Sequence, residues 1–450
     1  MKRVLIFGAG RSSSTLVRYL SEKAEKHDWQ VVVADISFKN SSIPDGKRIT
    51  KSVIDVKDQL ARDAEVNQAS LVISLLPAKM HKIVAQSCVK YFKNLLTASY
   101  ESNDLKAFES EVEEKGLLFL NEMGLDPGLD HMSAMRLINR IKNQGHELLC
   151  FESFTGGLIA PESDNNPWNY KFTWNPHNVV LAGQDGPARF IQQGKYKYIP
   201  YNRLFRRTEL VEIEGYGLFE GYANRDSLKY IEKYNLEGIP TIYRGTLRRP
   251  GFSRAWNVFV QLGATDDSFQ MKNLENMTCR EFINSFLYYH PSDSVETKLY
   301  HYMHIDQDSD IPGKLKWLGV FDDTPIGLKK GTPAQVLEHI LKQKWQLAPG
   351  DKDLVVMWHK FIYRDKTSGK PVKLTASMGY TGEDMEHTAM SATVGLPLAL
   401  ATELILAGKI SLTGMFIPTI PALYEPILTE LEKHGIVFNE ILHKETPVEW

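Results

Sequence analysis

The stretch Val4-Leu-Ile-Phe-Gly8-Ala-Gly10-Arg-Ser-Ser13 decides the fold expected of this chain. A short apolar run, Val4–Phe7, leads directly into a glycine pair and then into a helical pattern over Ser14–Lys23. This order is typical of the Rossmann fingerprint, in which glycines let the backbone approach a pyrophosphate and a helix amino terminus supplies free N–H groups. Ser13 stands where the fingerprint has its third glycine, which weakens the match. We name Gly8–Ser13 the glycine turn.

Short β-branched runs alternate with helical patterns over about the first 130 residues, as in a parallel sheet with crossover helices. The expected strands are Val4–Phe7, Val31–Ala34, Leu71–Leu76, Leu95–Ala98 and Leu117–Leu120. The expected helices between them are Ser14–Lys23, His81–Tyr91 and Leu105–Glu114. Ligands of doubly wound sheets bind outside the carboxyl ends of the strands, so the residues that follow these runs are the first site candidates.

Asp35 ends the second expected strand, where an acid can accept hydrogen bonds from the ribose hydroxyls of an adenine dinucleotide. A phosphate on the 2′ oxygen would meet this carboxylate as a like charge. Asp35 therefore favours NAD over NADP as cofactor. Arg11 could partly neutralise the repulsion, which leaves NADP as the alternative.

The sequence Asn121-Glu-Met-Gly-Leu-Asp-Pro-Gly-Leu-Asp-His131 follows the strand Leu117–Leu120 and places Asp126 at its carboxyl end. A carboxylate held there by a stiff turn is positioned for chemistry. The plainer interpretation is a strand-to-helix turn in which Asp130 caps a helix over Met132–Lys142. We name residues 121–131 the acidic loop.

Polar side chains elsewhere suggest what binds. Tyr100, after the fifth strand, could donate a hydrogen bond into the crevice or lie at a wet interface. Tyr222-Ala-Asn-Arg-Asp-Ser227 and Arg244-Gly-Thr-Leu-Arg248 place arginines beside turn residues. Arginine binds carboxylates bidentately, so the two segments suggest a polycarboxylate substrate, although surface ion pairs are the common alternative for any one arginine.

The composition describes an ordinary globular protein. The chain has 450 residues, 43% hydrophobic and 24% charged, with a net charge of −2. This balance gives no reason to expect nucleic acid or a membrane surface as partner. The three cysteines lie far apart, and the expected location is therefore the reducing cytoplasm. No metal site is expected, because histidines such as His131, His177, His359 and His387 stand alone.

The expected fold class is α/β. A Rossmann dinucleotide-binding domain covers residues 1–130 and is completed by residues 388–450, which begin with an apolar helix to Leu406. A second, α+β domain for substrate binding covers residues 131–387, with a strand pair over Asp353–Tyr363 and Lys370–Tyr380. A polar helical insertion interrupts this domain at about residues 270–345.

Over nearly its whole length the chain resembles the glutamate-forming saccharopine dehydrogenase (saccharopine reductase) family. The motifs that carry the resemblance are Ile73-Ser-Leu-Leu-Pro77, Thr97-Ala-Ser-Tyr100, Gly124-Leu-Asp-Pro-Gly-Leu-Asp-His131, Ala160-Pro-Glu162 with Asn166-Pro167, Tyr170-Lys-Phe-Thr-Trp174, Asn224-Arg-Asp-Ser227, Arg244-Gly-Thr-Leu-Arg248 and Thr393-Val-Gly-Leu-Pro397. The resemblance implies reversible oxidation of saccharopine, with water and a nicotinamide cofactor, to L-glutamate and L-2-aminoadipate 6-semialdehyde. It also implies a homodimer, with the α+β domain serving both catalysis and dimerisation.

The resemblance also implies site residues. Those that would border the cofactor are Gly10, Arg11, Ser12, Ser13, Asp35, Asp55, Val56, Leu76, Ala98, Ser99, Leu125, Asp126, Pro127 and Asn175, with Gly8 added from the glycine turn. Those that would hold saccharopine are Ser99, Tyr100, Asp126, Arg225, Thr246, Leu247 and Arg248, with Arg244 added from the arginine segments.

Two positions depart from the family. Fungal members carry an arginine for the 2′-phosphate one residue after Asp35, where this chain has Ile36, which again indicates NAD. Many members carry a cysteine at the position of Thr155, so any acid–base role of that thiol does not transfer. Asp126, with Tyr100 as hydrogen-bond partner, is therefore our leading acid–base candidate. An equally open interpretation is that Asp126 only orients the substrate amine.

Two alternatives to saccharopine oxidation remain at this stage. A relative acting on a polyamine conjugate such as carboxynorspermidine would want carboxylates in the pocket where the sequence has arginines. A regulatory protein that senses NAD without turnover would bind the cofactor but show no reaction with saccharopine.

Overall fold

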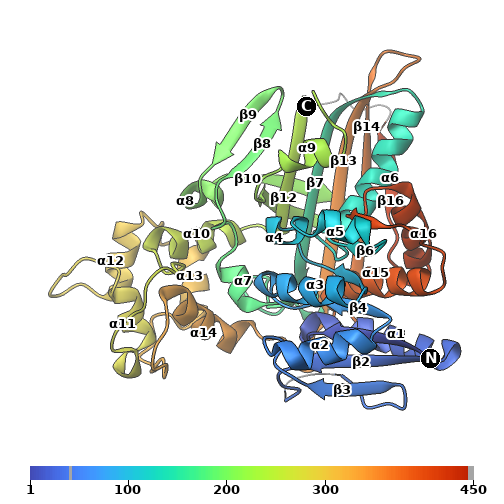
Figure 1. Cartoon of the computed structure of the whole chain (residues 1–450). Helices are drawn as coiled ribbons and strands as arrows, with labels where there is room; N and C mark the ends of the chain where they lie inside the picture. Colours follow the sequence, from blue (N-terminus) through green and yellow to red (C-terminus); the bar gives the residue numbers. More distant parts are fainter. Residues whose placement is uncertain (40–42, 444–450) are drawn as a thin grey trace. The chain divides into compact units, whose positions relative to one another are not determined.

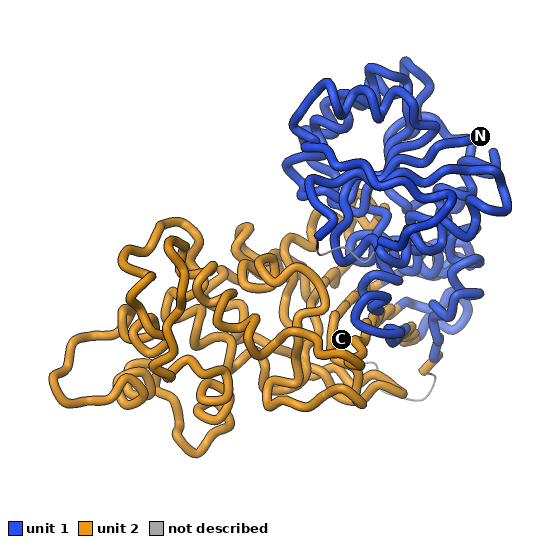
Figure 2. Tube along the Cα trace, turned by 90° about the horizontal axis from the view of Figure 1, so that it is seen from below, with its two compact units in different colours: residues 1–148, 363–371, 378–441 blue, residues 149–362, 372–377, 442–450 orange. Residues whose placement is uncertain are grey.

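The computed structural model describes residues 1–39 and 43–443, and the chain divides into two compact units (Figure 2). Among the described residues, unit 1 comprises residues 1–39, 43–148, 363–371 and 378–441, and unit 2 comprises residues 149–362, 372–377 and 442–443. The carboxyl-terminal stretch 378–441 therefore folds with the amino-terminal residues. Residues 444–450 of the expected segment 388–450 lie outside the described part of the chain.

Unit 1 is built on a seven-stranded sheet in the order β15-β6-β5-β4-β1-β2-β3. Every neighbouring pair is parallel. The strands are β1 (Lys2–Phe7), β2 (Trp29–Asp35), β3 (Ile49–Val53), β4 (Leu71–Ser74), β5 (Asn94–Thr97), β6 (Leu118–Leu120) and β15 (Gly414–Phe416). The order reverses between β1 and β4, as in doubly wound folds, and the expected α/β class is confirmed.

Two strands of this sheet, β3 and β15, are missing from the sequence-based expectation, and both lie at its edges. Ile49–Val53 pairs with β2 through five consecutive residues. Its side chains are half-buried or exposed because β3 lies at the edge of the sheet. An edge strand buries too little surface to need the apolar run by which the other strands are recognised.

The helices of unit 1 follow the expected pattern with different ends. They are α1 (Ser14–His27), α2 (Gln59–Gln68), α3 (His81–Lys90), α4 (Asn103–Lys106), α5 (Glu109–Glu114), α6 (Leu129–Asn143), α15 (Ala389–Leu406) and α16 (Pro421–Glu432). The single helix expected over Leu105–Glu114 is divided into α4 and α5. Short 3₁₀ turns, Arg11–Ser13 and Ala78–Met80, precede α1 and α3.

Helix α15 lies beside α1 and α16 (Figure 1). It begins where the Thr388 hydroxyl accepts the Ser391 N–H at 3.0 Å, and the Ser391 hydroxyl lies 2.7 Å from that of Ser14 in α1. The helix is long and apolar enough to cross a membrane, but 78% of it is buried inside the protein, as in the core helix of a folded domain. It therefore belongs to the core of unit 1.

A second, mixed sheet, most of whose residues belong to unit 2, has the strand order β10-β11-β12-β7-β13-β14-β16, to which β8 and β9 attach through β12. Its strands are β7 (Glu147–Ile159), β8 (Ala188–Gln192), β9 (Lys195–Ile199), β10 (Thr208–Ile213), β11 (Gly217–Ala223), β12 (Thr241–Arg248), β13 (Asp353–Arg364), β14 (Pro371–Thr381) and β16 (Asn439–His443). Strands β10, β11 and β12 are antiparallel neighbours, whereas β12 and β7 run parallel.

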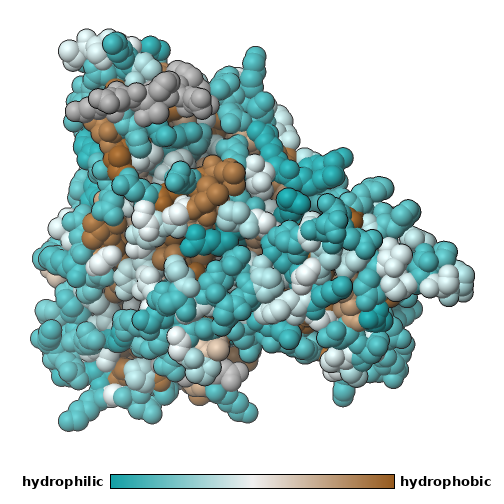
Figure 3. Space-filling model, turned by 180° about the vertical axis from the view of Figure 1, so that it is seen from behind, coloured by the Kyte–Doolittle hydropathy of each residue, from teal (hydrophilic) through white to brown (hydrophobic). Residues whose placement is uncertain are grey.

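The helices of unit 2 include those of the expected insertion. They are α7 (Pro176–Val180), α8 (Tyr201–Leu204), α9 (Lys229–Lys233), α10 (Phe252–Leu262), α11 (Cys279–Asn284), α12 (Val295–Tyr302), α13 (Asp310–Trp317) and α14 (Pro333–Trp345). Capping boxes begin α11 at Thr278 and α14 at Thr332. The core of unit 2 is rich in aromatic side chains. In it the Trp168 and Trp345 rings meet edge-on, with their centres 5.2 Å apart. Hydrophilic side chains dominate the face in Figure 3.

The contact between α15 and α1 depends on Gly395. A Cβ atom added there would lie 2.9 Å from the Leu16 backbone nitrogen and 3.1 Å from its Cβ. We therefore expect Gly395→Ala to lower the free energy of unfolding by about 1–3 kcal/mol, the usual cost of overpacking, despite the better helix propensity of alanine.

The matched control is Gly313→Ala in α13, where an added Cβ meets no atom within 4 Å. This variant should be unchanged or more stable by up to about 1 kcal/mol. Thermal and urea unfolding measure both variants. Equal stability of the two would contradict the tight contact.

Candidate functional site

The glycine turn joins β1 to α1. Gly8 has φ +108°, and an added Cβ would meet the Leu75 backbone at 3.2 Å, so only glycine fits. At Gly10 an added Cβ would meet no atom within 4 Å, and the backbone there faces open space. Ser13, in place of a third glycine, is buried and donates its hydroxyl to the Gly10 carbonyl at 2.7 Å. The turn therefore keeps the shape that a pyrophosphate needs.

Asp35 supports this turn from the end of β2. Its Oδ2 accepts the Ala9 N–H at 2.7 Å, and its Oδ1 accepts the Ser37 N–H at 3.2 Å. Each carboxylate oxygen therefore already accepts one backbone hydrogen bond. The side chain fixes the glycine turn whether or not a ribose is present.

Arg11 has a different environment. It is exposed at the glycine turn and helps to line a hollow, whose other lining residues are Ala9, Gly10, Ser13, Ser14, Ile43, Met385 and Glu386. Among residues 1–39 and 43–443 its guanidinium has no ion-pair partner. A cation in this setting can meet a phosphate group.

The other predicted cofactor neighbours in unit 1 are mainly apolar. Val56 is buried in the core, and Leu76 packs against the same cluster. Asp55 is exposed and accepts the Lys57 N–H at 2.9 Å. Ala98 is half-buried beside Gly124, where an added Cβ would lie 3.1 Å from that of Ala98. These residues lie after β3, β4 and β5, at the carboxyl edge of the sheet.

The acidic loop is closed by backbone hydrogen bonds. The Gly124 N–H donates to the Pro127 carbonyl at 2.9 Å, and the Leu129 N–H donates to the Gly124 carbonyl at 2.8 Å. Gly128 has φ +144°, and an added Cβ would lie 2.2 Å from the Gly124 oxygen. The bond between Asp126 and Pro127 is cis. The close approach of Gly128 to Gly124 therefore allows one narrow set of backbone angles there.

Tyr100 and Asp126 come together as the sequence suggested. The Tyr100 hydroxyl donates to the Asp126 Oδ1 at 2.9 Å, and both side chains are half-buried. A second acid of the loop, Glu122, lies 2.6 Å from the His131 Nε2, and both are fully buried. Glu122 also accepts the Glu101 N–H at 3.1 Å. The residues around Tyr100 and Asp126 are thus firmly held.

The predicted cap of the following helix was wrong. Helix α6 begins at Leu129, directly after Gly128, so Asp130 lies inside its first turn. The Asp130 Oδ1 reaches back to accept the Gly128 N–H at 2.6 Å. The helix begins earlier than expected because the bend at Gly128 finishes the loop, and Asp130 stabilises that bend instead of capping the helix.

His81, the first residue of α3, was not among the predicted site residues. It is 1% exposed, and its ring nitrogens meet two serines: Nδ1 lies 2.8 Å from the Ser74 hydroxyl, and Nε2 lies 2.7 Å from the Ser99 hydroxyl. Burial lowers the pKa of His81 to about 4. The motif Ile73-Ser-Leu-Leu-Pro77 could have drawn attention to it, because a strand and turn there lead into this helix.

Arg248 is the most unusual of the arginines in unit 2. It is 5% exposed, yet its only hydrogen bond within the described residues donates from Nη1 to the Leu247 carbonyl at 2.8 Å, and Nε has no partner. Aromatic rings surround the guanidinium, with Tyr170 at 5.1 Å, Phe252 at 5.4 Å and Tyr222 at 5.9 Å. In the part of the chain that the structure describes, no carboxylate pairs with it.

Buried polar groups without partners lie on neighbouring elements. The hydroxyls of Tyr170 and Thr155 form no hydrogen bond among the described residues. Burial raises the pKa of Tyr170 to about 12, so this hydroxyl stays protonated. Thr155 on β7 pairs in register with Thr246 on β12, two residues before Arg248. This region can therefore offer a cation and hydroxyl groups to an anion.

The other predicted substrate residues of unit 2 differ in exposure. Arg244 is buried, with its guanidinium 3.9 Å from the centre of the Tyr230 ring. Arg225 is about half exposed and lies 3.3 Å from Asp185, which places it in a surface ion pair. Leu247 is fully buried in the core, and Thr246 is half-buried.

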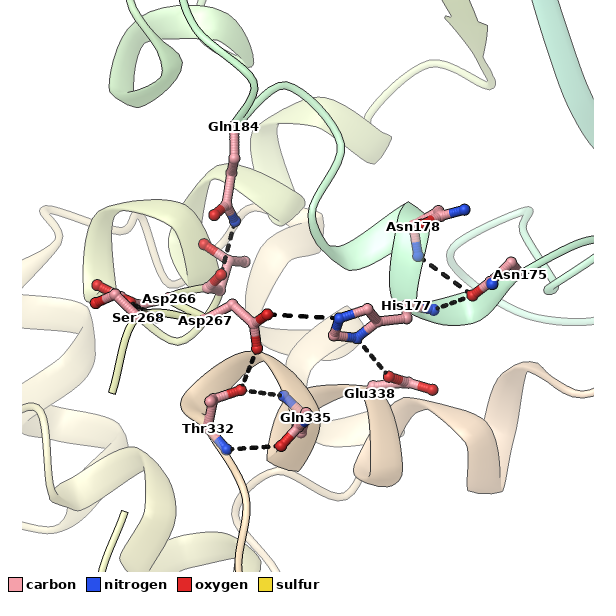
Figure 4. Close-up of polar contacts among 11 residues, drawn as sticks. Asn175, His177, Asn178, Gln184, Asp266, Asp267, Ser268, Thr332, Gln335 and Glu338 are labelled. Carbon is pink, nitrogen blue, oxygen red and sulfur yellow. Dashed lines mark hydrogen bonds and ion pairs between the residues drawn. The ribbon is translucent and has the colours of Figure 1, made fainter. Parts of the chain in front are cut away.

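Asn175 has a structural role in unit 2. Its side-chain oxygen accepts the His177 and Asn178 N–H groups at 3.0 and 3.4 Å and so caps α7 (Figure 4). The His177 ring lies between two carboxylates, 2.9 Å from Glu338 and 3.6 Å from Asp267. Asn175 itself is exposed. Within the described ranges, no group of three or more His, Cys, Asp or Glu residues is placed to hold a metal ion.

Two family models match the chain. The saccharopine dehydrogenase NADP binding domain matches residues 4–120, and the saccharopine dehydrogenase C-terminal domain matches residues 124–436. A crystal structure of saccharopine dehydrogenase (L-Glu forming) from Saccharomyces cerevisiae superimposes with a TM-score of 0.87 and 30% identity. It covers 99% of this chain and 100% of that one.

Curated relatives agree. The NADP(+), L-glutamate-forming saccharopine dehydrogenase of Pyricularia oryzae is 32% identical over 98% of both chains. The mitochondrial alpha-aminoadipic semialdehyde synthase of Rattus norvegicus is 32% identical over 97% of this chain but only 47% of its own length. The chain thus spans about half the length of the synthases that it matches.

The comparisons correct one expectation. The preference for NAD was wrong, because the matching domain is described as NADP binding and the full-length relatives are named for NADP+. The Asp35 carboxylate is already engaged with the glycine turn, and Arg11 can offset its charge. The resemblance inferred from the motifs is confirmed, and the chain belongs to the saccharopine dehydrogenase family.

Proposed function

We propose that the chain oxidises saccharopine, with NADP+ and water, to L-glutamate and L-2-aminoadipate 6-semialdehyde. The observation that carries this proposal is Arg248, a buried cation with no carboxylate among the described residues. An unpaired buried charge is costly, so a ligand anion should complete the pair. Saccharopine carries three carboxylates. A cationic polyamine conjugate would instead want acids at this position.

The glycine turn is the proposed site for the pyrophosphate of NADP+, which accepts a hydride from the substrate when it is bound. The backbone at Gly10 is open, and the amino terminus of α1, the positive end of a helix dipole, follows it. We assign the 2′-phosphate to Arg11, which can form a charge-assisted pair with it. Asp35 keeps the turn in shape through its bond to Ala9.

Two proton movements accompany the oxidation. The secondary amine of saccharopine must be neutral when hydride leaves the lysine-side carbon, and the water that attacks the resulting imine must lose a proton. We propose that Asp126 accepts the amine proton and passes it to solvent, and then takes the proton of the attacking water and gives it to the nitrogen of the departing L-glutamate. The Tyr100 hydroxyl holds the carboxylate at 2.9 Å throughout. The alternative role, orientation of the cationic amine, would need only the charge of Asp126. Thr155 is a poor proton carrier and would serve as a hydrogen-bond donor.

A homodimer and a cytoplasmic location are also proposed. The dimer is supported by the family resemblance and by the frequency of symmetric dimers among oligomers. The location is supported by the cysteines Cys88, Cys150 and Cys279, which are all buried thiols without a disulfide. Light scattering of the purified chain tests the first proposal, and imaging of the tagged protein tests the second.

The direct test of the function mixes the protein with saccharopine and NADP+ and follows the absorbance of reduced nicotinamide. We expect steady formation of NADPH, with L-glutamate as a product. Carboxynorspermidine is the comparison substrate. Absence of turnover with saccharopine would reject the proposal, and NADPH binding without any turnover would support a sensor instead.

Loss of the buried guanidinium should mainly affect the substrate. We expect Arg248→Ala to raise the KM for saccharopine at least about 30-fold, equivalent to about 2 kcal/mol, because a buried charge pair is lost. The Kd for NADPH should change less than about twofold. The matched control is Arg254→Ala, an exposed arginine on α10, which should leave both values unchanged. Equal effects on the two ligands would count against the assignment.

The acid–base role predicts a different pattern for Asp126. We expect Asp126→Asn to lower kcat about 10²-fold, the low end of general acid–base catalysis, with little change in the Kd for NADPH. Tyr100→Phe should have a smaller effect in the same direction. A raised KM for saccharopine with normal kcat would instead indicate that Asp126 only orients the amine.

Arg11 should determine how strongly the 2′-phosphate is bound. We expect Arg11→Ala to weaken NADPH binding about tenfold, the value of one charge-assisted hydrogen bond, and NADH binding less than about threefold. Fluorescence titration of the reduced nucleotides measures both constants. If both nucleotides weaken equally, Arg11 does not contact the 2′-phosphate.

A further inference from the structure

A row of hydrogen-bonded polar side chains at the carboxyl edge of the unit 1 sheet connects three elements. Ser74 ends β4, His81 begins α3, and Ser99 follows β5. The His81 ring lies between the two serine hydroxyls, at 2.8 Å from Ser74 and 2.7 Å from Ser99. Ser74 and His81 are buried, whereas Ser99 is only half-buried. Ser99 is therefore the end of this hydrogen-bonded row that a ligand can reach.

The hydroxyl of Ser74 determines which ring nitrogen carries the proton. Within the described residues its only hydrogen bond is to the His81 Nδ1, so its proton has that one acceptor. The Thr97 hydroxyl also approaches the ring, but its oxygen lies 3.3 Å from Nε2. A bond from the Thr97 hydroxyl to Nε2 would therefore be weaker than the bond from Ser74 to Nδ1, which spans 2.8 Å. The favoured arrangement has Ser74 donating to Nδ1, which leaves the hydrogen of the neutral ring on Nε2.

The consequence reaches Ser99. With Nε2 as donor, the Ser99 oxygen accepts from His81, and the Ser99 backbone N–H donates to the Thr97 oxygen at 3.2 Å. The Ser99 hydroxyl proton is then left to point away from the ring. Burial keeps His81 neutral, since its pKa is about 4, and so preserves this arrangement at neutral pH.

We propose that His81 is a positioning residue that fixes Ser99 as a hydrogen-bond donor to the ligand bound at this edge. The acceptor is an amide or carboxylate oxygen, which either the nicotinamide carboxamide or a saccharopine carboxylate can supply. The proposal rests on the proposed function only in the choice of these two ligands.

Two substitutions separate positioning from simple packing. Asparagine at position 81 places its amide near the Nδ1 position and keeps the contact with Ser74, but it does not reach Ser99. Glutamine is longer and can place an N–H group near the Nε2 position, toward Ser99. We expect the ligand affinity of His81→Gln to stay within about twofold of the wild type. The affinity of His81→Asn should fall by between about threefold and tenfold, the value of one neutral hydrogen bond.

The readouts are the Kd for NADPH by fluorescence titration and the KM for saccharopine, measured on the full chain. A loss in the first assigns the acceptor to the cofactor, and a loss in the second assigns it to the substrate. Ser99→Ala should lower the affinity as much as His81→Asn does. The double variant should lower it no more than Ser99→Ala alone, because both residues act through the single hydrogen bond from Ser99 to the ligand. A loss of affinity in the double variant equal to the product of the two single losses would overturn the proposal.

Ser74→Ala provides an independent test if the His81 variants fold poorly. It removes the group that fixes the ring, so the same constant should worsen in the wild-type background and stay unchanged in the Ser99→Ala background. Equal effects in both backgrounds, or equal losses in His81→Gln and His81→Asn, would make His81 a core histidine only. Failure of saccharopine turnover would reject the proposed function while the NADPH measurements still decide the role of His81.

Discussion

Parallel strands all end at the same edge of a sheet, and this constraint governs where polar residues can lie in unit 1. Its central strands are apolar and buried, so polar side chains collect where the chain leaves them. Gly8 follows β1, Ser74 ends β4, Thr97 ends β5, and the acidic loop follows β6. The strand order places β1 beside β4, and the chain turns in opposite directions from these two strands. A crevice opens at such a switch point, which explains why residues distant in sequence can serve one ligand.

In unit 2 the main candidate for ligand binding is a buried charge, that of Arg248, and not a turn. A buried guanidinium without an anion lowers stability, because its hydration is lost and no carboxylate replaces it. The rings of Tyr170, Phe252 and Tyr222 offset part of this cost through cation–π contacts with Arg248. Under the proposed function, the remainder is recovered when a carboxylate of the substrate binds. The arrangement is therefore held ready for a carboxylate before the substrate arrives, which favours tight and specific binding.

The sequence predicted the parts of the fold that depend on burial, and it missed those that depend on single contacts. The central strands were recognised because each is a buried apolar run, and β3 was missed because an edge strand does not need one. Tyr100 and Asp126 could be paired in advance, since they follow β5 and β6, which are neighbours in the sheet. His81 gave no such signal, because one histidine at the start of a helix has no periodicity. Its importance depends on the exact approach of two serines, which only the folded chain displays.

The cofactor shows why the sign of one charge is a weak guide. The expectation of NAD assumed that the Asp35 carboxylate is available to repel a 2′-phosphate. In the folded chain both of its oxygens accept backbone N–H groups, from Ala9 and Ser37, so its position follows from the needs of the glycine turn. An acid with that structural duty can be present whichever dinucleotide binds. Arg11 lies on the glycine turn itself and has no ion-pair partner among the described residues. The preference must then follow from the sum of charges around the ribose, in which an available cation can outweigh an acid that is already hydrogen-bonded.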